Sequence, residues 1–214
     1  MPRAAAIYWV RYHPLIPLPR QFRTHLGGVI GNERLTTVAG LALVPLLAAE
    51  LLTLLALGAL LTAHLFIGLW LVVPLAAKMG STGYRFLRYY TGARDYVQAG
   101  PPRWPARLLA PIVVVATLVL IGSGLALWAL GPSGREPFLV IHKLSFQVWW
   151  ISLVGHVLVH LGHVRRDSAS EFVQRQDGYS TRASVVGAAV LLGLVVAVSL
   201  ILLGPPWPAN TIGD

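Results

Sequence analysis

The sequence has no cysteine and few charged residues, and both absences narrow what the chain can be. Without cysteine it forms no disulfide and holds no iron–sulfur cluster, no thiolate zinc site and no haem attached through a CxxCH motif. Charged residues make up 12% of the chain, against roughly 25% in soluble domains. This low share, together with 56% hydrophobic residues, favours lipid as the surrounding solvent.

Acidic residues are scarce as well, since 8 Asp and Glu stand against 17 Lys and Arg, for a net charge of +9. A positive net charge is also typical of proteins that bind nucleic acid. Here, however, the basic residues lie between long apolar runs, which is the pattern of membrane topology. We therefore expect a lipid bilayer as the partner and no nucleic acid.

Five apolar segments are each long enough to cross a bilayer core of about 30 Å, which takes roughly 20 helical residues. They are residues 35–57, 60–79, 107–130, 137–164 and 184–203. A tight connection near Gly58 joins the first two, and the Gly-Pro-Ser-Gly turn at 131–134 joins the third and fourth. The sequence predicts an all-α integral membrane protein, with a bundle of about five transmembrane helices in one domain, residues 35–203.

Lys and Arg are distributed unevenly between the two ends of these segments. Five lie in residues 1–34, six between Lys78 and Arg107 and four between Arg165 and Arg182, all at one end. Arg135 and Lys143 lie at the other end. Because positively charged loops stay in the cytoplasm, we expect a multi-pass protein of the plasma membrane. Residues 1–34 then form a basic cytoplasmic or interfacial arm, and the tail 204–214 lies outside.

Two histidines fall at the same predicted depth on different helices. His64 is the fifth residue of segment 60–79 and His142 the sixth of segment 137–164, and both segments enter from the outer face. At 1.5 Å of rise per residue, both imidazoles lie about 6–8 Å inside the outer boundary. Ionisable residues inside a bilayer are costly, so each is a functional candidate. Two imidazoles at one level suit the axial ligation of a haem iron, and a hydrogen-bonded histidine pair is the alternative.

Small residues accompany this pair. Gly68 lies one turn after His64, and Gly122 and Gly124 fall in the same outer half of the third segment. The missing side chains would leave room for the edge of a flat porphyrin. Close helix packing through small residues, which is common in membranes, explains them equally well.

Glu50 also belongs to the outer half, near the end of the first segment. Three functions remain open for it on the sequence alone. It is a candidate proton acceptor if a quinol is oxidised beside the haem. It could instead hydrogen-bond the free ring nitrogen of His64 and fix its orientation, or be a protonated acid satisfied by a neighbouring helix.

His156, His160 and His163 follow at spacings of four and three, so they share one helix face near the cytoplasmic boundary. They could serve a second haem, line a quinone pocket, relay protons, or simply reside at the interface. A zinc or iron site of three imidazoles is a further alternative, although no carboxylate and no HExxH pattern accompanies them.

His142 and His156 are 14 residues apart, which is about 21 Å of helix rise and nearly the same face. With the runs HLFIG after Ala63, IHK at His142 and GHVLVHLGHVRR, the chain resembles the cytochrome b561 group and related membrane b-type cytochromes. It is closest in character to small cytochrome b subunits that partner molybdopterin oxidoreductases. The resemblance implies one haem b, or two. It covers about residues 35–164.

The chain departs from the two-haem pattern of that family at one position. The residue 14 positions after His64 is Lys78, not histidine. A second haem would need His156 or His160 with a ligand from elsewhere, and His25 of the basic arm is the nearest candidate, since His13 is more remote. One outer haem is the simpler interpretation.

No stretch outside the membrane is long enough for a flavin- or nicotinamide-binding domain. The sequence therefore predicts an electron-transfer subunit with haem b, which links the quinone pool to a partner redox enzyme and is not an enzyme by itself. A transporter or scaffold without a cofactor is the first alternative, and a histidine-based metal site at the cytoplasmic face is the second.

Overall fold

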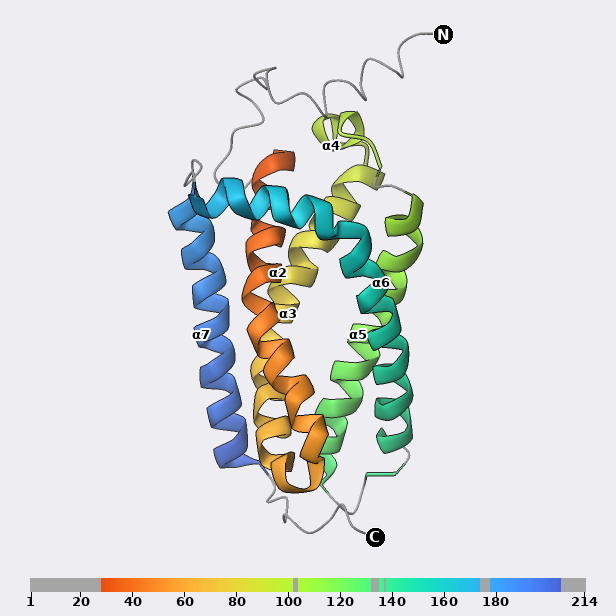
Figure 1. Cartoon of the computed structure of the whole chain (residues 1–214), viewed down its shortest axis with the longest axis vertical. Coiled ribbons are helices and arrows are strands. Elements are labelled where there is room, and N and C mark those ends of the chain that lie inside the picture. Colours follow the sequence, from red (N-terminus) through yellow and green to blue (C-terminus); the bar gives the residue numbers. More distant parts are fainter. Residues whose placement is uncertain (1–27, 102–103, 132–134, 137, 174–177, 205–214) are drawn as a thin grey trace.

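The computed structural model describes residues 28–101, 104–131, 135–136, 138–173 and 178–204, and for 162–173 it describes the backbone alone. These residues form α2 (Gly28–Thr53), the 3₁₀ turn η2 (Leu54–Ala56), α3 (Leu57–Tyr90), α4 (Arg94–Gln98), α5 (Trp104–Leu130), α6 (Phe138–Val173) and α7 (Tyr179–Leu203), and no strand (Figure 1). Most of the predicted basic arm, with His13 and His25, and the tail 205–214 lie outside the described residues.

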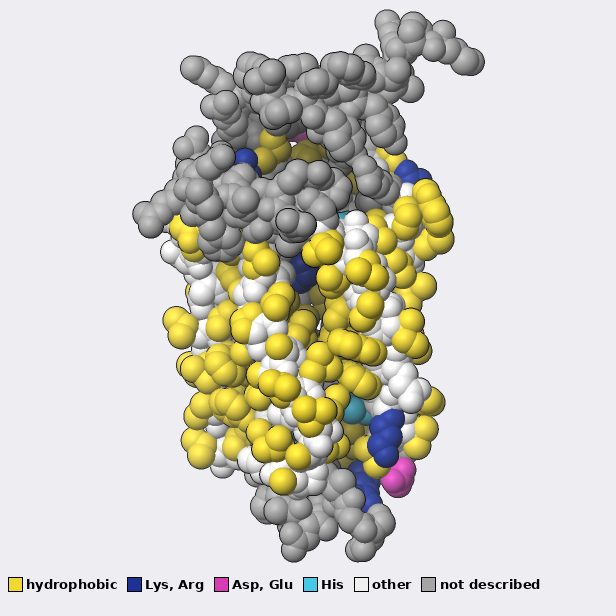
Figure 2. Space-filling model, in the orientation of Figure 1, with side chains coloured by type: hydrophobic (Ala, Val, Ile, Leu, Met, Phe, Trp, Pro, Cys, Tyr) yellow, Lys and Arg dark blue, Asp and Glu magenta, His cyan; other side chains and the backbone are white. Residues whose placement is uncertain are grey.

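Four helical stretches in this part of the chain are long and apolar enough to cross a membrane: Gly28–Tyr90, Trp104–Leu130, Phe138–Leu161 and Tyr179–Leu203. Their large apolar side chains face outward, as with Ile151 and Leu202, which are 73% and 77% exposed. Figure 2 shows such side chains covering most of the visible middle of the molecule. A soluble protein would bury this surface, so the chain is a multi-pass membrane protein.

The first of these stretches folds back on itself. Ala56 and Leu60 leave the helical region, with φ/ψ of −145°/52° and −106°/15°, and Gly58 lies between them. The chain therefore reverses where the close connection near Gly58 is predicted. At the far end of the hairpin the Thr36 and Ser81 hydroxyls are 2.7 Å apart and share a hydrogen bond, so α2 and α3 run antiparallel.

Two helices extend beyond the apolar runs that announce them. α3 continues past Met79 to Tyr90, and α6 continues past Val164 to Val173. Neither extension contains proline, so the backbone hydrogen bonds continue although the side chains become polar. α3 ends at Gly92, whose φ of +78° is typical of the residue that closes a helix.

The long helices form two groups (Figure 1). In the first, α3 packs against both α2 and α7, and in the second, α5 packs against α6. Gly193 permits a close approach of α7 to α3, since a Cβ there would lie 2.6 Å from the Trp70 carbonyl oxygen. The two groups contact each other much less, chiefly between α3 and α5 and between α2 and α6. Residues of α3 and α6 face each other across this junction.

Candidate functional site

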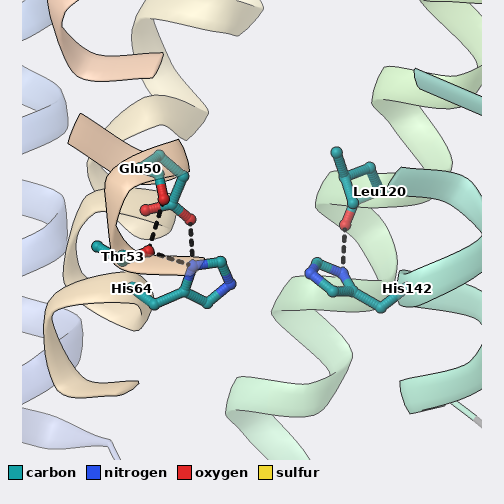
Figure 3. Close-up of polar contacts among 5 residues, drawn as sticks. All are labelled: Glu50, Thr53, His64, Leu120 and His142. Carbon is teal, nitrogen blue, oxygen red and sulfur yellow. Dashed lines mark hydrogen bonds and ion pairs between the residues drawn. The ribbon is translucent and has the colours of Figure 1, made fainter. Parts of the chain in front are cut away.

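His64 on α3 and His142 on α6 meet at the junction between the two helix groups. Their ring centres are 6.3 Å apart and their ring planes are nearly perpendicular, at 84°. In Figure 3 each ring turns one nitrogen toward its own helix group and its other nitrogen, Nε2, toward the opposite ring. The structure thus brings together the two histidines that share a depth in the sequence.

The inner nitrogen of His64 is held from α2. Its Nδ1 lies 3.0 Å from Glu50 Oε1 and 3.0 Å from Thr53 Oγ1 (Figure 3). The Thr53 hydroxyl donates its one hydrogen to the Glu50 backbone carbonyl, so toward His64 it acts as an acceptor. Both neighbours of Nδ1 therefore accept hydrogen bonds, which requires Nδ1 to carry the proton.

His142 is held in the same manner from α5. Its Nδ1 lies 3.2 Å from the Leu120 carbonyl oxygen and 3.1 Å from Ser123 Oγ. The Ser123 hydroxyl itself donates to the Leu120 carbonyl, at 3.0 Å. A hydroxyl in this position can only accept from the ring, so Nδ1 of His142 also carries the proton.

The protonated Nδ1 atoms leave both neutral imidazoles with a lone pair on Nε2. Two lone pairs that face each other inside an apolar bundle repel unless a cation lies between them. An imidazole nitrogen binds a metal at about 2 Å and lies about 1.1 Å from its own ring centre, so two rings on opposite sides of one metal ion are about 6 Å apart. The measured 6.3 Å agrees with this geometry.

The small number of ligands decides which metal group fits. Among the described residues no cluster of three or more His, Cys, Asp or Glu side chains could hold a metal ion. A structural zinc site needs four ligands and a catalytic one three. Two imidazoles on opposite sides suffice when a macrocycle supplies the remaining ligands, as the porphyrin does in haem. The donor set of His64 and His142 therefore fits haem.

Two of the three glycines of the predicted site make room for its polar side chains. A Cβ on Gly68 would lie 3.3 Å from Glu50 Oε1, and one on Gly124 would lie 3.2 Å from His142 Cε1. A Cβ on Gly122 would meet no other atom within 4 Å. Gly68 and Gly124 thus allow Glu50 and His142 to take their positions, and Gly122 borders open space.

Glu50 adopts the second of the three arrangements that the sequence leaves open, a hydrogen bond to His64. Its side chain is 17% exposed, and Oε1 accepts from Nδ1 of the ring. Its other oxygen, Oε2, is buried and has no partner in the described part of the chain. That Glu50 also accepts a proton from quinol stays a prediction.

His156 and His160 lie toward the other end of α6, with ring centres 4.5 Å apart. Lys78 of α3 lies near enough to His156 for their charges to interact. The side chain of His163 is outside the described residues, so the three-imidazole metal site stays a prediction, as do the second haem and the quinone pocket.

The sequence analysis misses Thr53 and Ser123, although both determine which nitrogen of each histidine faces the junction. A signal for them exists, because each hydroxyl lies three residues after the carbonyl to which it donates. Hydroxyl side chains that bond back within a helix are common, however, so this spacing alone does not single them out.

No protein-family model, no curated protein and no solved structure matches this chain.

Proposed function

We propose that the chain is a haem b-binding electron-transfer subunit of the plasma membrane, with His64 and His142 as the axial ligands of one haem. The observation that carries the proposal is the pair of opposed Nε2 atoms, each set free by a protonated Nδ1. Bound haem would supply reversible one-electron transfer inside the bilayer.

The protein's contribution is to orient and tune the two ligands. Thr53 and Ser123 hold the ring tautomers, so no proton has to leave Nε2 before a metal binds. Glu50 adds a negative group on the far side of His64, which makes that imidazole a stronger electron donor. The ligand environment is therefore asymmetric, with a carboxylate behind His64 and a backbone carbonyl behind His142.

Five membrane crossings follow if α2, α3, α5, α6 and α7 each span the bilayer. The reversal between Ala56 and Leu60 supports two crossings in the stretch Gly28–Tyr90. The excess of Lys and Arg at the end that carries α4 supports a cytoplasmic N-terminus and an outer C-terminus. His64 and His142 then lie in the outer leaflet.

Electrons reach and leave such a subunit through a membrane quinone and a partner redox enzyme. The chain needs a partner because it has no length for a substrate domain of its own. The outer position of the ligands favours a partner on the outer side, and the family resemblance favours a molybdopterin oxidoreductase. A quinol hydroxyl near the site would find Glu50 Oε2 without another hydrogen bond.

The test is a reduced-minus-oxidised absorption spectrum of the purified protein, with haem quantified per chain. We expect one low-spin haem b, abolished by His64→Ala and by His142→Ala and retained in His156→Ala, which is the matched control on α6. Loss of haem in His156→Ala as well would indicate a second haem. A colourless protein, made with ample haem supply, would overturn the proposal and favour a transporter or scaffold.

A further inference from the structure

A second polar cluster lies at the other end of the same two helices. Lys78 follows His64 by 14 residues on α3, and His156 follows His142 by 14 residues on α6. Fourteen residues are about 21 Å of helix rise. The facing pair of histidines at one end of the junction is thus replaced by a lysine and a histidine at the other.

Lys78 brings a positive charge to this level without an acidic partner. Its Nζ donates to the Thr36 carbonyl oxygen of α2 at 3.1 Å. It fits there because α2 has glycine at position 40, where a Cβ would lie 2.9 Å from Nζ. Within the described residues no carboxylate forms an ion pair with Lys78. The ammonium group therefore has donors to spare and a charge that the described side chains leave uncompensated.

His156 offers a second unused donor or acceptor. Its Nδ1 is buried and has no hydrogen-bond partner among the described residues, unlike Nδ1 of His64 and of His142. Its ring is therefore not held by a bond at Nδ1 as the two candidate haem ligands are. Because Lys78 is close enough to act on it electrostatically, both groups can reach one ligand.

The missing partner must be negatively charged and must reach this depth. A charged side chain in a bilayer is stable when it is paired. A haem between His64 and His142 does not reach Lys78, because its iron lies about 21 Å away along the helices. At that distance from the outer site, Lys78 lies close to the opposite boundary of a hydrocarbon core of about 30 Å, where lipid phosphates begin.

We propose that Lys78 and His156 bind the phosphate of one anionic phospholipid at the junction between the two helix groups. The choice of the cytoplasmic leaflet rests on the membrane orientation given under the proposed function, whereas the binding site itself does not. Lys78 belongs to the group of α2, α3 and α7 and His156 to the group of α5 and α6. The bound phosphate joins the two groups at one end, as the metal ligands join them at the other.

The experiment is native mass spectrometry of the purified protein after mild detergent washing, with the retained phospholipids and the haem counted in each chain. We expect one tightly held anionic phospholipid in the wild type and in Lys143→Met, which removes an exposed lysine from the opposite end of α6. Retention falls about tenfold in Lys78→Met, because the charge–charge attraction is lost. Haem content is the same in all three proteins.

Equal retention by Lys78→Met and wild type overturns the inference. So does a quinone or a second haem that is lost with Lys78 in place of a phospholipid. Should Lys78→Met fail to fold, Gly40→Ala tests the same site, because the new Cβ displaces the ammonium and keeps its charge. A wild type that holds the phospholipid and no haem would disprove the proposed function and leave this site standing.

Discussion

At the scale of single residues, the candidate site depends on two hydroxyl groups that bind neither metal nor substrate. Thr53 and Ser123 each donate their one hydrogen to a backbone carbonyl and so present a lone pair to a histidine. The Nδ1 proton of each ring is thereby fixed, and the other nitrogen is free for a metal. The depth of His64 and His142 can be predicted by counting residues from the membrane boundary. Their tautomers cannot, because they depend on side-chain contacts between helices.

Glu50 provides a prediction at this scale. Glu50→Gln keeps an oxygen beside Nδ1 of His64 and removes the negative charge that stabilises oxidised iron. A change of about 1 kcal/mol in this charge-assisted bond corresponds to roughly 40 mV for one electron, so we expect the haem midpoint potential to rise by about that amount. A potentiometric redox titration of the purified protein measures it.

The control for this substitution is Glu136→Gln, which removes a carboxylate whose side chain is 66% exposed. Its potential should equal that of the wild type. If Glu50→Gln also leaves the potential unchanged, the carboxylate of Glu50 does not tune the site through His64, and it acts as a packing group alone.

At the scale of the helices, the apolar runs announce where α2, α3, α5, α6 and α7 lie but not where they end. Hydropathy reports the thickness of the bilayer, whereas a helix ends where its backbone hydrogen bonds stop. α3 therefore continues past its apolar run to the glycine at 92, and α6 continues to Val173. The pairing of α5 with α6 follows from their short connection, while the sparse junction between the two groups follows from no local signal.

Two glycines of α5 yield a prediction about this junction. A Cβ on Gly124 would press on the His142 ring at 3.2 Å, whereas one on Gly122 would meet nothing within 4 Å. Valine costs a helix the same propensity at both positions, so their difference isolates the contact. Overpacking of about 1–3 kcal/mol should lower the haem bound per chain in Gly124→Val by more than twofold. Haem absorbance per milligram of protein measures the effect.

Gly122→Val serves as the matched control and should keep the haem content of the wild type. Equal haem loss in both variants would mean that the substitutions act on α5 as a whole. Equal retention in both would mean that the His142 ring can shift without losing its function as a ligand.

At the scale of the whole molecule, the arrangement is two rigid helix groups with few contacts between them. Most of the apolar surface faces lipid, so the bilayer provides little force to press the groups together. The polar pairs at the two ends of the junction compensate for this, with His64 and His142 at one end and Lys78 and His156 at the other. Ligands at these pairs would set the relative position of the groups and, with it, the position of the redox site.

The orientation of this assembly can be tested directly because the chain contains no cysteine. Leu55→Cys in the α2–α3 turn, Glu136→Cys before α6 and Gln98→Cys in α4 each introduce one exposed thiol. With the basic end in the cytoplasm, a membrane-impermeant maleimide should label Cys at 55 and 136 in intact cells. It should label Cys at 98 only after permeabilisation. Labelling at 55 also establishes that α2 and α3 both cross the membrane, which makes five crossings. The opposite labelling pattern would invert the orientation and place the candidate haem ligands near the cytoplasm, where the redox partner would then have to bind.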